Sequence, residues 1–435
     1  MKTCAQPNRP AWLQNVPAEW SVPLLRLVAR VESGHTPSRG AHEYWVPEEC
    51  TIPWFSLADI WQLRDGRQKY LGETKELISP AGVANSAARI LPPGTVILSR
   101  TASVGFSGIM PKPMATTQDF VNFICGDRLI PDYLLWVLRG MKTEFERLSL
   151  GSTHMTIYMP DLLQFRVPLP PLKTQLAIAD YLDRKIAAVD AIIEKKEHHI
   201  ALLAERKQAL ITARIFGAKV LVASSLQRTL EGRPPGWEVM PLWSCFAPVK
   251  EQGFPNLGLL SVYRDYGVIY KDSREDNHNR AGEDLAIYQR VVPGDVVFNR
   301  MKAWQGSVAV SDLLGIVSPD YQVLRPRSEF FDKAYLHHLL RSSVYIAEYA
   351  RLSKGIRPSQ WRLMYDEMRT LPLLIPPLSV QAQIAAEISK ALDAGSGVAS
   401  LVLKEIDRLH EYRQALITAT VTGQLDIGES PHESH

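Results

Sequence analysis

Few residues in this chain have both the type and the spacing that catalysis requires. Glu73 and Lys75 show the Glu-x-Lys spacing found in some nucleases, which would suit metal-assisted phosphodiester hydrolysis. No Pro-Asp pair precedes them at a useful distance, so a solvated loop is the favoured interpretation. His198 and His199 fall within a long helical stretch and are interpreted as a solvated face rather than a metal site.

Two nucleotide-related motifs are missing from the sequence. The Pro-Pro pairs at 92, 170, 234 and 376 are followed by Gly or Leu, and none forms the Asn/Asp-Pro-Pro-Tyr/Phe motif of amino-methylation. A G-x-x-x-x-G-K-[ST] phosphate loop is excluded because the chain contains no Gly-Lys dipeptide. We therefore predict a non-catalytic protein, and an autonomous enzyme is the weakest interpretation.

Composition places the chain among ordinary folded proteins. Forty-six per cent of its 435 residues are apolar and the net charge is only +3, so any nucleic-acid surface must be a local patch. The four cysteines (Cys4, Cys50, Cys125 and Cys245) show neither zinc-ligand spacing nor a disulfide framework, which suggests a reducing cytoplasm. No apolar stretch is long enough to predict export or a membrane span.

An internal repeat organises the whole chain. Pro-Pro-Leu-x-x-Gln begins at Pro170 and again at Pro376, and Gln-Ala-Leu-Ile-Thr-Ala begins at Gln208 and again at Gln414, both at an offset of 206 residues. The preceding regions repeat at offsets that drift from 217 to 200, as in the pair Arg100 and Arg300. One ancestral unit, duplicated and then diverged, explains this pattern.

Each repeat ends in a long amphipathic helix with a heptad stripe. In the first repeat, about 42 residues from Thr174 to about Ile215 contain no Gly or Pro and would span roughly 60 Å as a helix. The stripe predicts an antiparallel coiled coil between the two helices, which would serve either as a spacer or as a dimerisation or bundle core. Lys196 and Lys207 interrupt it, and Gly395 and Gly397 predict a bend or break. The stripe comprises Leu182, Ile186, Val189, Ile193, Ile200, Leu203 and Leu210, then Ile388, Leu392, Val402, Ile406, Leu409 and Leu416.

The region before each helix is predicted to be an α+β domain. Runs rich in Val, Ile and Phe at 52–57, 94–99 and 294–299 indicate strands, and helices are expected at about 131–148 and 332–352. The predicted fold class is thus α+β, with two globular domains separated by two long helices and related by a pseudo-two-fold repeat. The predicted boundaries are 1–171 and 237–377 for the globular domains, 172–217 and 378–427 for the helices, 218–236 for a linker and 428–435 for a tail.

The order of these parts resembles the specificity subunits of type I restriction-modification systems. In the first half the resemblance lies in Ser33-Gly-His-Thr-Pro37, Ile52-Pro-Trp-Phe-Ser-Leu57, Leu91-Pro-Pro-Gly-Thr-Val-Ile-Leu-Ser-Arg100 and Thr116-Thr-Gln118. In the second half it lies in Leu259-Leu-Ser-Val-Tyr263, the run from Val292 to Gly306 and Gly315-Ile-Val-Ser-Pro-Asp-Tyr321. Each globular half is similar to a target recognition domain of that family.

The resemblance implies that this chain recognises DNA and that partner subunits carry out the chemistry. Each domain would bind one half of a bipartite double-stranded DNA target, and the helices would dock two methyltransferase subunits. S-adenosylmethionine would be bound by the methyltransferase, and ATP and Mg would be bound by endonuclease and translocase subunits that can join, so this chain would bind no cofactor itself. The main alternative is a tandem-domain scaffold that assembles other subunits and does not bind DNA.

Polar loop residues are the candidates for DNA contact, because base edges and phosphates are bound by such side chains. Arg100 and Arg300 follow equivalent strands, so a framework role and a phosphate contact both stay open. Trp304 is interpreted as packing rather than as an intercalating wedge. The candidates are Arg100, Thr101, Ser103, Gln118, Ser152, Thr153 and His154 in the first half, then Arg300, Lys302, Trp304, Gln305, Lys354, Arg357, Ser359 and Gln360 in the second.

Overall fold

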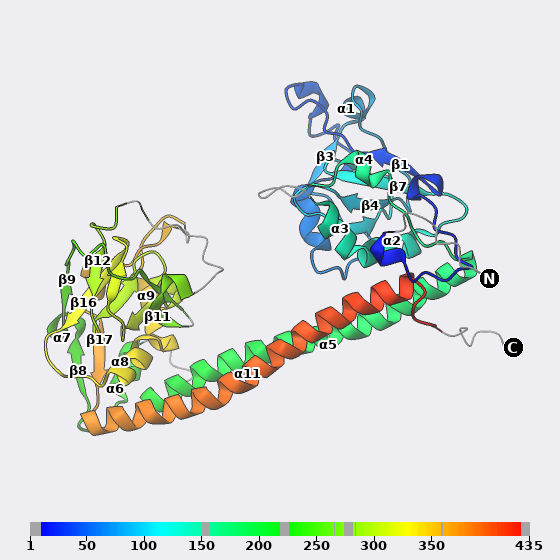
Figure 1. The fold of residues 1–435 in the computed structure, drawn as a ribbon. Helices are drawn as coiled ribbons and strands as arrows, with labels where there is room; N and C mark the ends of the chain where they lie inside the picture. The colour runs from blue at the N-terminus through cyan, green and yellow to red at the C-terminus, as the bar shows by residue number, and fades with distance from the viewer. Residues whose placement is uncertain are drawn as a thin grey trace. The chain divides into compact units, whose positions relative to one another are not determined.

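The chain folds into two compact units. The computed structural model describes residues 10–149, 156–217, 226–264, 266–273, 282, 284–357 and 360–427. Unit 1 comprises Met1–Glu197 with Lys404–His435, and unit 2 comprises His198–Leu403. Each unit combines one globular α+β domain with a segment of each of the two long helices (Figure 1).

A four-stranded antiparallel sheet forms the centre of unit 1. Its strand order is β1-β7-β4-β5, and the strands β4 and β5 are buried along their whole length. Unit 1 also contains a smaller sheet with the strand order β3-β2-β6, which has its own small core around Trp54 and Ile78. The strands are β1 (Ala29–Ser33), β2 (Ile52–Phe55), β3 (Glu76–Ile78), β4 (Val96–Ser99), β5 (Ser107–Ile109), β6 (Ala115–Thr116) and β7 (Phe120–Cys125).

Unit 2 repeats this central sheet with the same strand order. Its order, β9-β16-β13-β14, matches β1-β7-β4-β5 strand for strand. The loosely repeating sequences therefore form equivalent strands. The strands are β8 (Glu238–Pro241), β9 (Phe246–Val249), β10 (Leu260–Tyr263), β11 (Gly267–Tyr270), β12 (Gln289–Val291), β13 (Val296–Asn299), β14 (Val308–Val310), β15 (Gly315–Val317), β16 (Tyr321–Pro326) and β17 (Pro372–Ile375).

A Pro-Gly turn precedes the equivalent strands β4 and β13. Gly94 and Gly294 have φ values of 81° and 98°, a backbone region that glycine enters at little cost. The Gly94 amide donates to the Met110 carbonyl at 2.8 Å, and the Gly294 amide donates to the Ser311 carbonyl at 2.7 Å. The repeated Pro-Gly pair thus sets the direction in which each buried strand enters its sheet.

Helices cover the sheets and carry the chain into the long helices. In unit 1, Tyr133 and Leu134 of α2 belong to the same core as Val96 of β4 and Leu182 of α5. In unit 2, Tyr335 of α8 plays the same part. The helices are α1 (Pro80–Ala84), α2 (Pro131–Gly140), α3 (Lys142–Leu148), α4 (Met159–Leu162), α5 (Leu172–Phe216), α6 (Leu226–Glu231), α7 (Leu242–Cys245), α8 (Lys333–Leu340), α9 (Ser343–Leu352), α10 (Tyr365–Met368) and α11 (Leu378–Val421).

The prediction that α5 and α11 pair in antiparallel fashion is confirmed. In unit 1, Lys196 Nζ lies 2.5 Å from Glu405 Oε2 and Arg413 Nε lies 2.8 Å from Asp190 Oδ1, so residue numbers fall along one helix as they rise along the other. In unit 2, Arg214 pairs with Glu387 at 3.0 Å in the same sense. Every predicted stripe residue is buried or partly buried.

The predicted break at Gly395 and Gly397 is wrong, because α11 runs without interruption from Leu378 to Val421. The conformational cost of two glycines is about 2 kcal/mol in total. Continuous helical hydrogen bonding and burial of the flanking stripe residues Ile388 and Val402 offset that cost. Packing between the helices therefore overrides the local preference.

Replacing Gly395 and Gly397 together with alanine should stabilise the protein by about 1 to 2 kcal/mol, because alanine favours helix more strongly than glycine does. A Cβ atom at either position would meet nothing within 4 Å. Urea unfolding followed by circular dichroism measures the change. The matched control is Gly140→Ala in α2, where a Cβ would lie 3.0 Å from a Val421 methyl group and should destabilise the protein. Loss of stability in the double variant would show that α11 is not helical there.

A buried glutamine explains the Pro-Pro-Leu-x-x-Gln motif at the start of each long helix. The Gln175 side chain accepts a hydrogen bond from the Ile130 amide at 3.0 Å and donates to the Arg128 and Pro170 carbonyls, both at 2.9 Å. Gln381 makes the equivalent bonds to the Asp332 amide and to the carbonyls of Phe330 and Pro376. Each glutamine thus fastens a long helix to the start of α2 or α8.

Candidate nucleic-acid interface

Arg100 and Arg300 occupy equivalent places immediately after β4 and β13. Arg100 Nε donates to the Gln118 carbonyl at 2.9 Å, and Arg300 Nε donates to the Asp320 carbonyl at 3.2 Å. A second Arg300 nitrogen donates to the Pro319 carbonyl. Because the two arginines bind the same loop in both units, the framework interpretation is favoured for their Nε groups, and both side chains are only half-buried.

The same backbone hydrogen bond brings two candidate loops together in each unit. The Ile157 amide donates to the Arg100 carbonyl at 2.9 Å, and the Leu363 amide donates to the Arg300 carbonyl at 2.8 Å. The loop after β4 or β13 therefore lies next to the segment that leads back toward the long helix. Segments that are more than fifty residues apart in sequence form one surface in each unit.

In unit 1 the surface contains Thr101, Ser103 and Gln118. The turn after β4 includes Ala102, whose φ is 60°, and the Ser103 amide donates to the Thr101 carbonyl at 2.6 Å. Gln118 is exposed, and its side-chain oxygen accepts a hydrogen bond from the Thr36 hydroxyl at 2.6 Å. This bond joins the loop at 33–37 to the candidate surface. The candidates Ser152, Thr153 and His154 lie outside the described residues.

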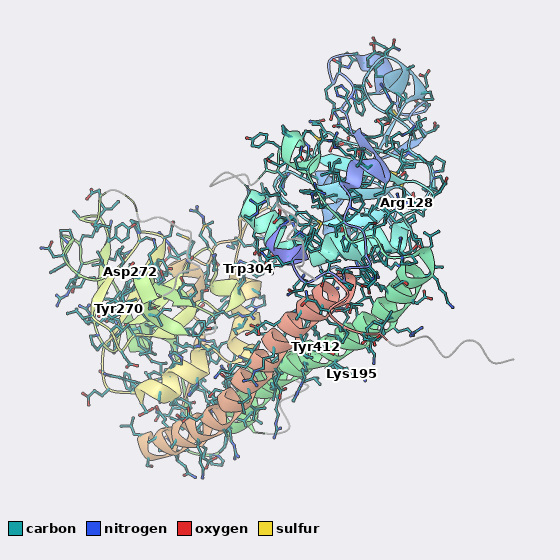
Figure 2. The ribbon with its side chains drawn as sticks, turned by 45° about the vertical axis from the view of Figure 1, so that its right-hand side comes forward. Arg128, Lys195, Tyr270, Asp272, Trp304 and Tyr412 are labelled. Carbon is teal, nitrogen blue, oxygen red and sulfur yellow. The ribbon has the colours of Figure 1, made fainter. Side chains whose placement is uncertain are left out.

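In unit 2 the first candidate loop carries Lys302, Trp304 and Gln305. Lys302 and Gln305 are exposed, whereas the Trp304 ring packs edge to face against Trp361 with 5.4 Å between ring centroids. The Trp304 indole nitrogen donates to the Met301 carbonyl at 3.1 Å. Trp304 therefore joins the two loops of the surface, and Figure 2 shows it within unit 2.

The second loop of unit 2 carries Lys354, Arg357 and Gln360, which are all exposed or half-buried. Lys354 Nζ lies 2.6 Å from Glu367 Oε1, so its charge is already partly compensated. Ile356, which the sequence reasoning missed, is 95% exposed next to Arg357. The sequence feature that could have identified Ile356 is its position as an apolar residue inside the basic run Lys354-Gly-Ile-Arg357. Ser359 lies outside the described residues.

Arg357→Ala should weaken binding to the cognate DNA about tenfold or more, because a base contact by arginine contributes about 1–3 kcal/mol of discrimination. Lys354→Ala is the matched control and should have a smaller effect on affinity, since Lys354 is paired with Glu367. Competition gel shifts at a fixed, stated salt concentration measure both variants. An equal loss on cognate and scrambled DNA would assign Arg357 to a phosphate instead of a base.

The described residues offer little for covalent or metal chemistry. Burial raises the pKa of the Cys125 thiol to about 12, so it stays protonated near neutral pH. No group of three or more His, Cys, Asp or Glu residues that could hold a metal ion occurs in the described part of the chain. Within that part, no helix is long and apolar enough to cross a membrane.

Comparison with known proteins finds similar chains among restriction enzyme specificity subunits. Residues 17–202 match the type I restriction modification DNA specificity domain family. The chain is 28% identical over 190 residues to the type I restriction enzyme MjaIX specificity subunit of Methanocaldococcus jannaschii, which is 43% of this chain and 42% of that one. It is 20% identical over 378 residues to the StySPI specificity subunit of Salmonella potsdam, covering 81% and 79% of the two chains.

The fold agrees with this class. A chain from a solved structure of the type I R-M system superimposes with a TM-score of 0.61 and 18% identity, covering 94% of this chain and 99% of that one. The matched segments span less than half of the MjaIX subunit and of the EcoR124I/EcoR124II specificity subunit of Escherichia coli, at 42% and 45% of their lengths. Residues 17–202 thus match the type I restriction modification DNA specificity domain, and the chain as a whole is similar to type I restriction enzyme specificity subunits.

Proposed function

We propose that this chain recognises a bipartite DNA target, with each unit binding one half of the target. The observation that carries the proposal is the pair of loops that each unit joins through the carbonyl of Arg100 or Arg300. The framework beneath the loops is the same in both units, while the loop residues differ. Equivalent placement with different side chains suits two DNA half-sites of different sequence.

Within a complex, the long helices would hold partner subunits. Each unit contains the same antiparallel pairing of α5 with α11, so each offers an equivalent surface to one methyltransferase subunit. Exposed side chains such as Lys195 and Tyr412 point outward from the helix pair (Figure 2). Two methyltransferase subunits, one for each unit, follow from this duplication.

The chemistry would then belong to the partners, and this chain would supply target recognition without catalysis. The methyltransferase subunits would bind S-adenosylmethionine and methylate adenine. Endonuclease and translocase subunits, which use ATP and Mg, would add restriction. The complex would act in the cytoplasm, where its DNA target lies.

Mapping of N6-methyladenine tests this function. The chain would be expressed with its cognate methyltransferase in a host that lacks other adenine methylation. We expect methylation at one target made of two short, unlike sequences with a fixed gap. Methylation independent of this chain, or with no sequence preference, would leave the tandem-domain scaffold as the better description.

A further inference from the structure

A cavity in unit 2 is larger than its equivalent in unit 1. It has a volume of about 910 Å³ and lies among the last turns of α5, the helices α8 and α9, and the loop after β13. The corresponding hollow in unit 1, which Arg139, Arg413 and Gln414 help to line, measures about 310 Å³. The same joint between a globular domain and a long helix therefore encloses a smaller hollow in unit 1 than in unit 2.

Side chains of α11 close the joint in unit 1. Gln414 Nε2 donates to the Arg139 carbonyl, and the Thr418 hydroxyl donates to the Gly140 carbonyl, both at 3.1 Å. Arg413 pairs with Asp190 and also donates to the Gly66 carbonyl at 2.9 Å. The pair is largely buried, with 13% of each side chain exposed, so charge is balanced where the helix meets the domain.

The repeat places different residues at these positions in unit 2. Lys207 corresponds to Arg413, and Ser396 corresponds to Asp190, so the carboxylate is replaced by a hydroxyl. Gln208 corresponds to Gln414, but among the described residues its buried Oε1 atom has no hydrogen-bond partner. A terminal amide can present either its oxygen or its NH2 group by a half-turn. The side chain is thus available to a polar ligand.

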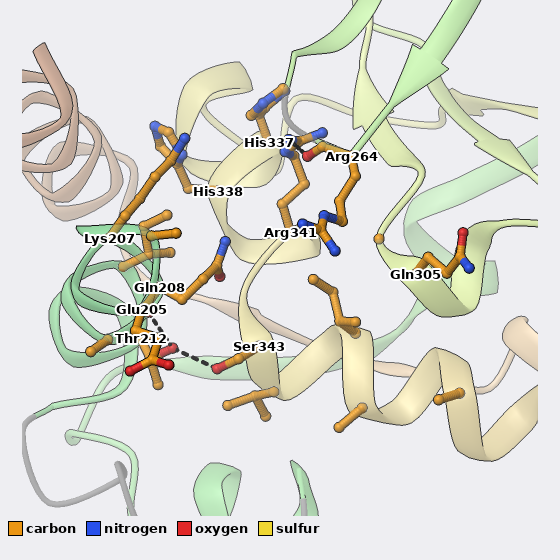
Figure 3. A pocket seen from close by; sticks show the side chains of 18 of the residues that line it. Glu205, Lys207, Gln208, Thr212, Arg264, Gln305, His337, His338, Arg341 and Ser343 are labelled. Carbon is orange, nitrogen blue, oxygen red and sulfur yellow. Dashed lines mark hydrogen bonds between the residues drawn. The ribbon is translucent and has the colours of Figure 1, made fainter. Parts of the chain in front are cut away.

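Basic side chains outnumber acidic ones among the described residues that line this cavity. Lys207, Arg264 and Arg341 line it, and Glu205 is the only acidic residue among its described lining residues. Figure 3 shows Lys207 with His338 on one side and Arg264 with Arg341 on the other, and Gln208 reaching between them. No ion pair of Lys207 occurs among the described residues.

Two histidines lie largely buried beside these basic side chains. Burial, and then the charge of Arg341, lowers the pKa of His337 to about 3. Burial, Arg341 and Lys207 lower the pKa of His338 to about 4, against a small opposing effect of Asp332. Both imidazoles are therefore neutral at pH 7 and have one N–H donor each. The His337 donor binds the Val310 backbone, so His338 is the imidazole that can donate to an anion. The hydroxyls of Thr212 and Ser343 lie 3.0 Å apart, and the Thr212 hydroxyl donates to the Gln208 carbonyl at 2.9 Å, so they bind within the protein.

We infer that this cavity binds a nucleotide phosphate, with Lys207, Gln208 and the His338 imidazole as the groups that contact it. The Lys207 ammonium group and the N–H groups of Gln208 and His338, in a cavity whose described lining residues include few carboxylates, suit the charge and the oxygen atoms of phosphate. The volume exceeds that of one phosphate and is bounded by the Trp304 ring, which leaves room for a sugar and a base. This inference does not depend on DNA recognition by the loops, because the ligand can be either a free nucleotide or a nucleotide of DNA.

Calorimetric titration of the full chain with ADP, and separately with a short DNA duplex, distinguishes the two sources. Imidazole NMR signals of His337 and His338 report occupancy of the site directly. We expect saturable binding of one of these probes, with shifts of both signals, and an affinity about tenfold lower in Lys207→Gln, as expected for loss of a charged hydrogen bond. Lys195 carries an exposed charge elsewhere on α5. Lys195→Gln is therefore the matched control and should change neither the affinity nor the shifts of the imidazole signals.

The double variant Lys207→Arg with Ser396→Asp provides the second test, because it installs the ion pair of unit 1 in unit 2. It should keep the thermal stability of the parent protein and lose the imidazole response to the probe. Response to ADP would assign the site to free nucleotides, and response to duplex alone would assign it to DNA. Unchanged imidazole signals with both probes, or equal losses in Lys207→Gln and Lys195→Gln, would overturn the inference.

Discussion

Replacing Arg413 with alanine is expected to destabilise unit 1 by about 3 kcal/mol, because removing one partner leaves the other charge buried without compensation. Arg413 Nε lies 2.8 Å from Asp190 Oδ1, and 13% of each side chain is exposed. The substitution also removes the hydrogen bond from Arg413 to the Gly66 carbonyl. Native-state hydrogen exchange of amides in α5 near Asp190 measures the loss where it occurs.

The repeat supplies the control for this prediction. Lys207 has the position in unit 2 that Arg413 has in unit 1, but its side chain is exposed. Lys207→Ala should therefore change the free energy of unfolding by no more than about 0.5 kcal/mol. Equal losses in the two variants would mean that the ion pair with Asp190 contributes nothing specific.

Leucine in place of Gln175 or Gln381 is expected to destabilise the respective unit by about 4 kcal/mol, since unsatisfied buried polar groups cost about 1–3 kcal/mol each. Gln175 is 1% exposed and Gln381 is 0% exposed. Leucine fills a similar volume but leaves one backbone amide and two backbone carbonyls without their partner in each unit. Urea unfolding measured by tryptophan fluorescence gives the change.

A neighbouring glutamine on α11 serves as the control for this pair. Gln383 is exposed and donates to Glu387 at 3.2 Å within the same helix. Gln383→Leu should change the free energy of unfolding by about 0.5 kcal/mol or less. Stability losses in Gln175→Leu and Gln381→Leu no larger than in this control would contradict the proposed role of the motif.

Much of the architecture could be predicted because it depends on periodicity and repetition. The heptad stripe of Leu182 and its successors predicted the helix pair, and the offset of 206 predicted the equivalence of Gln175 and Gln381. The strand order of the central sheets could not be predicted, because β1 pairs with β7 through contacts between distant segments. The expected break at Gly395 failed because local propensity was weighed without the packing of α11.

The candidate interface was only partly accessible to sequence reasoning. Loops rich in polar residues after β4 and β13 were identifiable, but the bond from the Ile157 amide to the Arg100 carbonyl was not. The partial burial of Arg139 could not be predicted from the sequence either. Its guanidinium donates to the Gly66 and Gln68 carbonyls at 2.8 and 2.6 Å. An arginine in a helix suggests a solvated face unless the tertiary structure is known.

Exchange of one globular domain tests the central claim most directly. Residues 10–171 would be replaced by the matching segment of a relative with a different target, the buried glutamine and long helices would be kept, and N6-methyladenine would be mapped with the same methyltransferase subunits. If each unit binds its own half of the target, one half of the methylated sequence changes while the other half and the gap stay the same. An unchanged target, or a change in both halves at once, would contradict that account.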